Sequence, residues 1–313
     1  MRLRFIFNPK SGRQGRNAGI LPLLRAYVGA HGAADLVCTE GPGHATDLAR
    51  EAAAAGYQRV VAVGGDGTVN EVAQALIHTP VIMGLVPCGS GNGLALHLGL
   101  PKTVPAALAL AAAPDCRVAE LDTGSVNGLL FVNAMGLGLD ADVARRFNSL
   151  TRRGLPAYAR TALAAFLGRR TERCRITHGG RQETIDVLLI AVANSDQYGN
   201  NAKIAPGARV DDGILDLVAV RPVSLLAAAV LGTRLFLGTV DRSRKVLRLN
   251  GARFMIERDA AGLVHTDGET HMAAAEVEVA VLPRSLRVAV PADCHAVASL
   301  SAASHHAFAL QFP

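Results

Sequence analysis

The residues of this sequence best suited to chemistry form the run 64–68, Gly-Gly-Asp-Gly-Thr, directly after four apolar residues. Glycines let the backbone turn sharply and approach a ligand closely. A helix should follow, because Val69 and later apolar residues recur at the spacing of one helix face. Thr68 and Glu71 also have the spacing of a capping box. Free N–H groups at the start of a helix bind anions, so the run predicts a phosphate site.

Asp66 is the unusual residue of this run, because a carboxylate repels phosphate groups. Two arrangements remove the conflict. A cation such as Mg²⁺ lies between the carboxylate and the phosphates, or the carboxylate accepts a proton during the chemistry. The alternative without chemistry is a plain glycine-rich turn in which Asp66 makes a turn hydrogen bond.

Two further polar loops follow apolar, strand-like runs. Residues 8–13, Asn-Pro-Lys-Ser-Gly-Arg, present two cations and a hydroxyl, and residues 87–95 place Ser90 among glycines. Such groups suit phosphate, although the first loop is equally typical of a plain basic turn. A second glycine-rich loop at a strand end strengthens the prediction of one shared ligand site.

The elements that must position these loops alternate between strand and helix. We expect strands at 3–7, 34–38, 60–63 and 81–86, and helices at 16–30 and 45–55. This order predicts an α/β domain with a parallel Rossmann-like sheet, whose ligands bind at the carboxyl ends of the strands. Asn8, Thr39 and Gly64 all follow such ends.

The second half of the chain changes to hairpin signals. We expect turns at Asn127-Gly128, 178–180, Asn250-Gly251 and Pro283-Arg284, each between two strand-like runs. Hairpins in series predict an antiparallel β-sandwich domain. We therefore divide the chain into a nucleotide-binding domain at 1–118 and a β-rich substrate domain at 119–290, with a tail at 291–313 that could return to the first domain.

Composition narrows the class of protein. The chain has 313 residues, a formal net charge of +6 and five cysteines. The cysteines are scattered and form no CxxC pair, which argues against a disulfide framework or a zinc site and favours the cytoplasm. No apolar run reaches the roughly 20 residues that span a bilayer. The positive charge favours an anionic partner, but sparse aromatic residues and the lack of a known motif argue against nucleic acid.

Three motifs together resemble the diacylglycerol kinase catalytic domain family, which includes bacterial soluble lipid kinases and the sphingosine kinases. They are residues 8–12, residues 64–72 (GGDGTVNEV) and residues 87–92 (PCGSGN). The GGDGT core is shared with NAD kinases and phosphofructokinases, whereas the other parts favour lipid kinases. Many bacterial members have a threonine and an Asn-Asp pair in the third motif, so Gly-Ser-Gly-Asn is closer to the sphingosine kinases.

The resemblance implies that ATP and Mg²⁺ bind in a cleft between the domains. The nucleotide-binding residues expected from the loops and the resemblance are Asn8, Ser11, Gly12, Thr39, Gly64, Gly65, Asp66, Gly67, Thr68, Asn70, Glu71, Gly89, Ser90 and Asn92. Mg²⁺ should bridge the ATP phosphates near Asp66.

Three carboxylates are candidates for the proton acceptor. A neutral alcohol must lose its proton as it attacks the γ-phosphate, and a nearby carboxylate can accept it. The resemblance points to the loop that holds Asp267 and Glu269, which we rank almost level, and Asp66 is a rival base. Without the resemblance, the loop reads as a solvated turn.

A metal site is implied at Asp212. Paired aspartates before a glycine make a tight turn or hold a hard cation. The resemblance implies a structural Mg²⁺ on Asp212, with the carbonyl groups of Arg209 and Ile214 as further ligands.

Two stretches could contact lipid. Residues 145–175 are rich in arginine with interspersed apolar side chains, typical either of a helix on an anionic membrane or of a solvated helical insertion. Residues 225–237 are apolar and either cover a lipid tail or form a buried helix. The expected partner is a lipid substrate at a membrane surface, with peripheral association, and a homodimer is left open.

The sequence therefore predicts an ATP-dependent lipid kinase that acts on diacylglycerol or a related lipid, with a sphingoid base or phosphatidylglycerol as other acceptors. Two alternatives stay open. One is a kinase of a soluble substrate such as NAD, and the other is a nucleotide-binding regulator without turnover.

Overall fold

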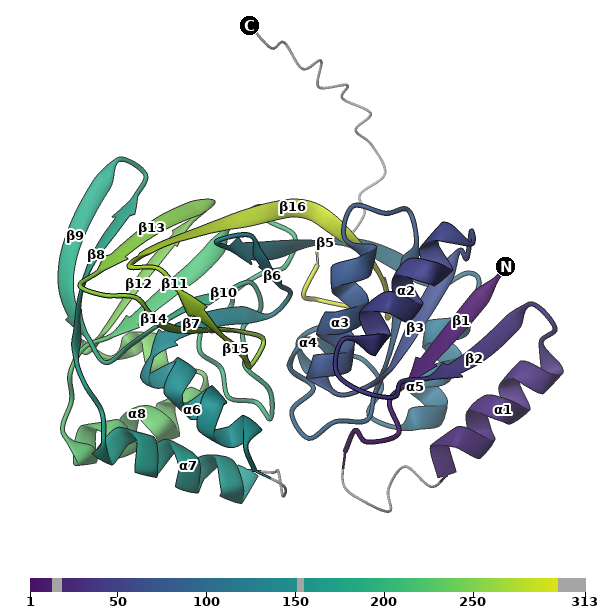
Figure 1. The fold of residues 1–313 in the computed structure, drawn as a ribbon, viewed down its shortest axis with the longest axis horizontal. Coiled ribbons are helices and arrows are strands. Elements are labelled where there is room, and N and C mark those ends of the chain that lie inside the picture. The colour runs from purple at the N-terminus through teal and green to yellow at the C-terminus, as the bar shows by residue number, and fades with distance from the viewer. Residues whose placement is uncertain (13–18, 151–154, 298–313) are drawn as a thin grey trace, which may run out of the picture.

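The computed structural model describes residues 1–12, 19–150 and 155–297. Two regions lie side by side in Figure 1, the first third of the chain on the right and the later residues on the left. The elements of the first region are β1 (Leu3–Phe7), α1 (Ile20–Ala30), β2 (Ala34–Cys38), α2 (His44–Ala54), β3 (Arg59–Gly64), α3 (Asp66–Leu76), β4 (Ile82–Pro87), α4 (Gly93–His97) and α5 (Val104–Ala112).

The first region contains the expected parallel sheet. Its strands lie in the order β2-β1-β3-β4 and every adjacent pair is parallel. One face of the sheet packs on α2 and α3 through residues such as Ala49 and Val72, and the other packs on α1 and α5 through Leu24 and Leu108. Apolar burial on both faces explains why the inner strand β3 contains the uninterrupted apolar run 60–63.

The second region is antiparallel, as expected. Its elements are β5 (Arg117–Val126), β6 (Leu129–Phe131), β7 (Ala134–Gly138), α6 (Leu139–Asn148), α7 (Leu155–Leu167), β8 (Glu172–His178), β9 (Arg181–Val187), β10 (Leu189–Ala193), β11 (Leu215–Val220), α8 (Leu225–Leu237), the 3₁₀ helix η2 (Val240–Arg242), β12 (Val246–Gly251), β13 (Arg253–Arg258), β14 (Gly262–Thr266), β15 (Glu269–Ala273) and β16 (Glu276–Val290). Six strands form the sheet β12-β11-β10-β7-β14-β15, which shares one apolar core with the strands of the other sheet.

The turn predictions are half right. The turn at Asn127-Gly128 joins β5 to β6, and Gly179-Gly180 joins β8 to β9. Asn250-Gly251 is not a hairpin, because β12 pairs with β11 in one sheet whereas β13 pairs with β16 in the other. The run 129–134 is likewise divided between β6 and β7, which belong to different sheets.

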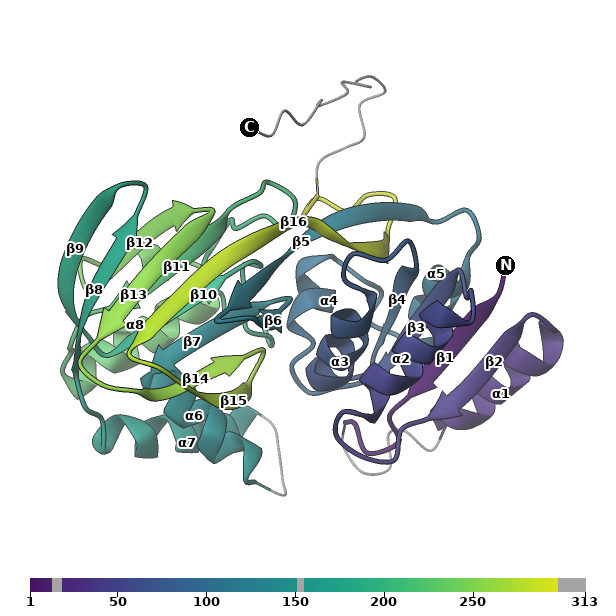
Figure 2. The same cartoon turned by 45° about the horizontal axis from the view of Figure 1, so that its top comes forward.

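Pro283-Arg284 is also not a hairpin. Both runs around it belong to β16, which pairs with β5 on either side of a register shift between Leu282 and Leu286. Proline has no N–H to donate, and a bulge is one of the few places where a sheet tolerates it. Figure 2 shows β16 as one long strand that crosses from the left region to the right.

The strand β16 connects the two regions into a single ten-stranded sheet. Its Val288 is a parallel partner of Met83 in β4, whereas its first half pairs with β13. Beyond it, Cys294 and Val297 are buried in the core that α2 and α3 cover. The division at 118/119 remains our proposal. None of the described helices is long and apolar enough to cross a membrane.

Candidate active site between the two regions

The two glycine loops of the first region touch each other. A Cβ atom on Gly89 would lie only 2.6 Å from the Cα atom of Gly65. Asp66 joins the loops further, because its carboxylate accepts hydrogen bonds from the N–H groups of Asn92 and Gly93, both at 2.7 Å. Asp66 therefore caps the start of α4 and is no ordinary turn aspartate.

The predicted capping box is wrong. The helix α3 begins at Asp66, its N-cap is Gly65, and no side chain caps it. Thr68 lies inside the first turn, where its hydroxyl accepts a hydrogen bond of 3.1 Å from the Asn8 side chain. The Glu71 carboxylate instead accepts a hydrogen bond of 3.1 Å from the N–H of Ala45 at the start of α2.

The remaining expected nucleotide residues lie along the same strand ends. Ser11 turns the first loop back by donating its hydroxyl to the Asn8 carbonyl at 2.9 Å. Gly12 has a φ of 82°, which suits glycine, and Ser90 is exposed at the tip of the second loop. Thr39 is buried at the end of β2, where its N–H donates to Phe7.

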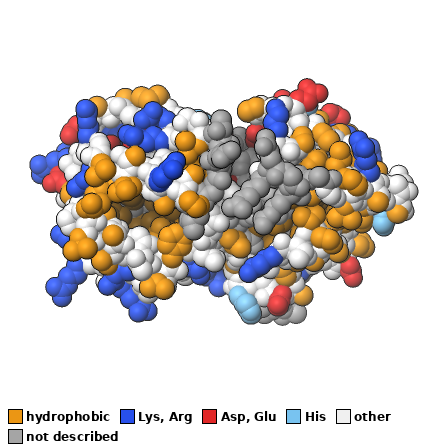
Figure 3. Space-filling view, turned by 90° about the horizontal axis from the view of Figure 1, so that it is seen from below, with side chains coloured by type: hydrophobic (Ala, Val, Ile, Leu, Met, Phe, Trp, Pro, Cys, Tyr) orange, Lys and Arg blue, Asp and Glu red, His pale blue; other side chains and the backbone are white. Residues whose placement is uncertain are grey.

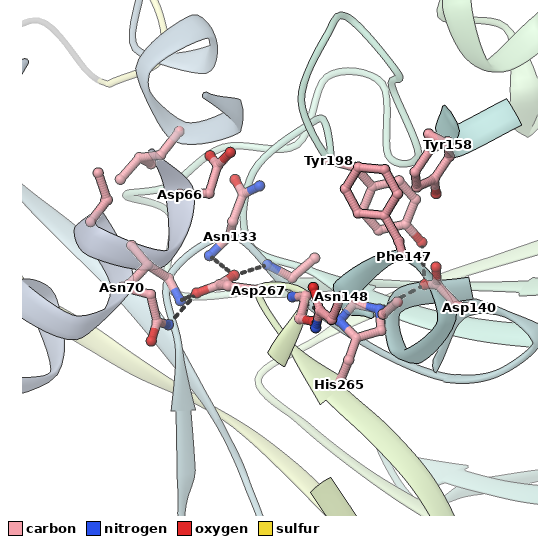
Figure 4. A pocket seen from close by; sticks show the side chains of 16 residues that line it. Asp66, Asn70, Asn133, Asp140, Phe147, Asn148, Tyr158, Tyr198, His265 and Asp267 are labelled. Atoms are coloured by element: carbon pink, nitrogen blue, oxygen red, sulfur yellow. Dashed lines mark hydrogen bonds and ion pairs between the residues drawn. The ribbon is translucent and has the colours of Figure 1, made fainter. Parts of the chain in front are cut away.

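A cavity of about 150 Å³ lies where the two regions meet. Asp66 and Asn70 from α3 line one side, and Asp267 and Asp140 come from the other region. Figure 4 shows these side chains facing a common space, with the aromatic ring of Tyr198 on the far side. The cavity is therefore lined by residues of both regions.

Asp66 lies in an environment that favours its protonated form. Burial raises the pKa of its carboxyl above the ordinary value, the N–H groups of Gly93 and Asn92 oppose the shift, and the charge of Asp267 adds to it. A carboxylate whose protonated form is favoured accepts a proton more readily at neutral pH.

The carboxylate of Asp267 has more hydrogen-bond donors than that of Asp66. Its carboxylate accepts hydrogen bonds from the N–H groups of Val132, Asn133 and Ala134 at 2.8, 2.9 and 2.9 Å. The amide of Asn70 adds a fourth at 2.6 Å, across the boundary between the regions. Asp267 therefore holds the two walls of the cavity together.

Sequence reasoning missed a second buried carboxylate, Asp140, at the start of α6. Its Oδ2 atom accepts a hydrogen bond of 2.6 Å from the Tyr198 hydroxyl and lies 3.1 Å from His265 Nε2. The N–H of Gly268 donates to His265 Nδ1 at 3.3 Å, so the ring hydrogen sits on Nε2 and points to Asp140. The sequence holds one signal for this site, because two glycines, Gly136 and Gly138, come just before Asp140. In the structure a Cβ atom on Gly136 would lie 2.5 Å from His265 Nε2, so glycine leaves room for these side chains.

Of the expected site residues, only Asp66, Asn70 and Asp267 line this cavity. Glu269 is exposed at the start of β15, and the Glu71 carboxylate is hydrogen-bonded to the N–H of Ala45 at the start of α2.

The Asp212 loop has a local excess of negative charge. Burial raises the pKa of Asp212, and the nearby carboxylates of Asp122, Asp216 and Asp211 add to the shift. A cation would relieve this repulsion. However, no three His, Cys, Asp or Glu side chains among the described residues are placed to hold a metal together. Any ion here would need backbone carbonyls, such as those of Arg209 and Ile214, for most of its ligands.

Comparison with known proteins places these features in a family. The diacylglycerol kinase catalytic domain model matches residues 2–126, and the YegS C-terminal NAD kinase beta sandwich-like domain model matches residues 133–290. A Pseudomonas aeruginosa protein named "Probable lipid kinase YegS-like" is 33% identical over 287 residues, which cover 90% of this chain and 92% of that protein. A Bacillus subtilis diacylglycerol kinase is 26% identical over 279 residues, 86% of this chain and 89% of that protein.

Solved structures share the fold. A crystal structure of a diacylglycerol kinase from Bacillus anthracis has a TM-score of 0.72 at 19% identity and covers 94% of this chain and 98% of that one. An NAD kinase from Archaeoglobus fulgidus, solved with ATP, has a TM-score of 0.55 at 14% identity, covering 92% and 93% of the two chains.

Proposed function

This chain belongs to the family of diacylglycerol kinase and YegS-like lipid kinases, and from that premise we propose that it transfers the γ-phosphate of ATP to a hydroxyl of diacylglycerol or a related lipid. The observation that carries the proposal is the cavity between the regions. One wall presents Asp66 of the first glycine loop together with Asn70 and Leu94, and the other presents Asp140 among apolar and aromatic side chains.

ATP would lie across the loops at Asn8, Thr39, 64–70 and Ser90. The close contact of Gly65 and Gly89 and the open space beside Gly67 fit a phosphate chain drawn close to the backbone. Mg²⁺ would take most of its ligands from the phosphates, near Asp66, and would neutralise charge that develops on them. A structural Mg²⁺ at Asp212 stays part of the proposal.

We rank Asp66 first as the base. The acceptor oxygen would attack the γ-phosphorus, the bond between that phosphorus and the bridging oxygen of ADP would break, and the hydroxyl proton would pass to Asp66. Asp267 ranks below it because four hydrogen-bond donors already occupy its carboxylate oxygens. Glu269 ranks below it because it is exposed and lies outside the cavity.

The polar head of the acceptor would bind at Asp140. Tyr198 and His265 both donate to its Oδ2 atom, and no described residue donates to Oδ1. A hydroxyl or ammonium group of the lipid would donate a hydrogen bond to the Oδ1 atom of this carboxylate. An acceptor of this kind is delivered from a bilayer, so we place the protein in the cytoplasm as a peripheral membrane enzyme.

The test is transfer of label from γ-labelled ATP with Mg²⁺ to mixed micelles that contain diacylglycerol, phosphatidylglycerol, ceramide or sphingosine, in parallel with NAD. Label should enter one lipid. Asp66→Asn should lower that transfer by at least about 100-fold, because it removes the proton acceptor.

Glu269→Gln is the matched control and should retain most of the activity. Label that enters only NAD would contradict the lipid acceptor. Tight ATP binding without any transfer would instead favour the nucleotide-binding regulator. A large loss in Glu269→Gln together with an active Asp66→Asn would overturn our choice of base.

A further inference from the structure

The described surface has a second hollow, which is strongly basic. It has a volume of about 330 Å³ and is lined by Arg173, Thr184, Ile185, Asp186, Arg221, Pro222 and Lys245. We call the hollow between the cations Arg173, Arg221 and Lys245 the cationic pocket. These three positive residues line it with a single carboxylate, Asp186, and none of the three side chains forms an ion pair with any described residue.

Backbone hydrogen bonds fix the three segments that supply these cations. Arg173 is the cross-strand partner of Asp186 in the pair β8 and β9. The N–H of Arg221, after β11, donates to the carbonyl of Lys245, before β12, at 2.9 Å. The cations are therefore held near one another by the ends of four strands, and like charges so placed favour an anion between them.

Exposed apolar side chains adjoin this pocket. The helix α8 begins only three residues after Pro222 and has no buried residue, so of the two alternatives given for 225–237 the buried helix is wrong. It packs on the sandwich through Ala227, Ala228 and Leu231. Its other side chains and those of α7 form an exposed apolar face: Leu163, Leu167, Leu225, Leu226, Val230, Phe236 and Leu237.

The pocket and the apolar face share one corner of the molecule. The Arg169 guanidinium, just after α7, donates to the carbonyl of Val223 at 3.2 Å and so ties the end of α7 to the start of α8. Leu167 is 66% exposed and Leu226 is 78% exposed on either side of this tie. Figure 3 shows hydrophobic side chains gathered on the left half of this face, with basic side chains at its edge.

We propose that this corner is a docking site for an anionic phospholipid, distinct from the acceptor cavity. The phosphate of the headgroup would bind between Arg173, Arg221 and Lys245, and the acyl chains would lie along the exposed apolar face. A soluble phosphate compound would use the cations alone and would leave that face in water, so the adjoining leucines favour the lipid.

The site also bears on catalysis. Tyr158 of α7 lines the acceptor cavity, whereas Leu163 and Leu167 of the same helix belong to the apolar face. Docking through this face therefore brings the acceptor cavity to the bilayer. The inference rests on the proposed function for the view that the partner is a lipid, yet binding can be measured without turnover.

The test is co-sedimentation of the whole protein with vesicles of phosphatidylcholine, with and without phosphatidylglycerol. The variant Arg173→Gln/Arg221→Gln/Lys245→Gln should lower the partition coefficient for anionic vesicles roughly 100-fold, since each cation near such a surface contributes about 5-fold. Arg25→Gln/Lys102→Gln/Arg181→Gln removes the same charge from exposed positions elsewhere and should cause a much smaller loss. Leu167→Ser/Leu226→Ser should weaken binding to both kinds of vesicle.

Equal binding of the two triple variants would overturn the site. Binding of inorganic phosphate at the pocket by calorimetry, without any charge-dependent vesicle binding, would overturn the lipid as its source. Transfer to short-chain diacylglycerol in neutral micelles should be the same in the wild type and in the pocket variant. A protein that phosphorylates no lipid but loses vesicle binding in that variant would refute the proposed function and support the docking site.

Discussion

At the scale of single residues, two aspartates that line the same cavity have different surroundings. Asp66 and Asp267 both line the cavity, but Asp66 accepts hydrogen bonds from two backbone N–H groups, whereas Asp267 accepts from three backbone N–H groups and the Asn70 amide. Burial raises the pKa of Asp66 and the charge of Asp267 adds to that shift, so we keep Asp66 as the proposed proton acceptor. Asp267 instead joins residues of both regions through its four donors.

Asp140 gives a prediction about the acceptor. We expect Asp140→Asn to raise the KM for the lipid about 10-fold or more, because an amide binds a donor more weakly than a carboxylate. The KM for ATP should change little. Steady-state kinetics with each substrate varied in turn would measure both constants, and an equal rise in both would contradict a role confined to the acceptor.

Asp196 gives a prediction about pH. Its carboxylate lies 2.7 Å from His97 Nδ1, at the end of α4, and 3.0 Å from Lys203 Nζ. Burial alone would raise the pKa of Asp196, but the hydrogen bonds and charges of His97 and Lys203 lower it to about 2. Its pKa in the folded state is below that of the unfolded chain, so its stabilisation is present above about pH 4 and is lost as the pH falls toward 2.

Asp196→Asn should therefore lower the free energy of unfolding at pH 7 by about 1–3 kcal/mol, since it removes the carboxylate that His97 and Lys203 contact. The difference from the wild type should shrink as the pH falls from 4 to 2. Urea unfolding at several pH values would measure this, and a difference independent of pH would refute it.

At the scale of elements, the approach of the two glycine loops is the most specific feature. A Cβ atom on Gly89 would lie 2.6 Å from Gly65 Cα and 2.8 Å from Asn92 Oδ1. We expect Gly89→Ala to push the loops apart, which should cost about 1–3 kcal/mol of stability and weaken ATP binding about 10-fold. Thermal unfolding and calorimetry would measure the two effects.

Gly67→Ala is the matched control for stability. No heavy atom lies within 4 Å of a Cβ atom there, so the midpoint of unfolding should not fall. A Gly89→Ala protein that unfolds and binds ATP like the wild type would show that the loops tolerate separation.

Local sequence patterns predicted where strands and turns lie better than they predicted which strands pair. The strands at 3–7 and 34–38 lie where expected, because apolar periodicity and glycine or proline boundaries are local signals. The turn at Asn127-Gly128 is also local, with φ angles of 47° and 83° that suit these residue types. Asn250-Gly251 carries the same signal, yet the chain there passes between sheets, and only packing against β11 and β16 decides that.

At the scale of the whole molecule, β16 makes the two regions interdependent. Leu286, Val288 and Val290 of this strand belong to the same core as Val60 and Met83. We expect the isolated fragment 1–118 not to unfold cooperatively, because it lacks these side chains and exposes an edge of β4. Circular dichroism during heating would measure this. A cooperative transition near that of the intact chain would contradict it.

The sequence by itself determined the classes of element and the phosphate loops. Glycine runs after apolar strands, and a parallel order of strands, follow from residues close together in the chain. Family motifs carried the kinase prediction, and the comparisons confirm the family.

Only the tertiary structure decided which carboxylates share the cavity. Asp66, Asp140 and Asp267 are far apart in sequence, and their roles depend on donors that residues such as Tyr198 and Asn70 bring to them. The sequence also did not show that one face of α8 is exposed, because an apolar helix has the same sequence pattern whether a protein core or a bilayer covers it. Burial and hydrogen bonding are properties of packed neighbours, and sequence spacing does not encode them.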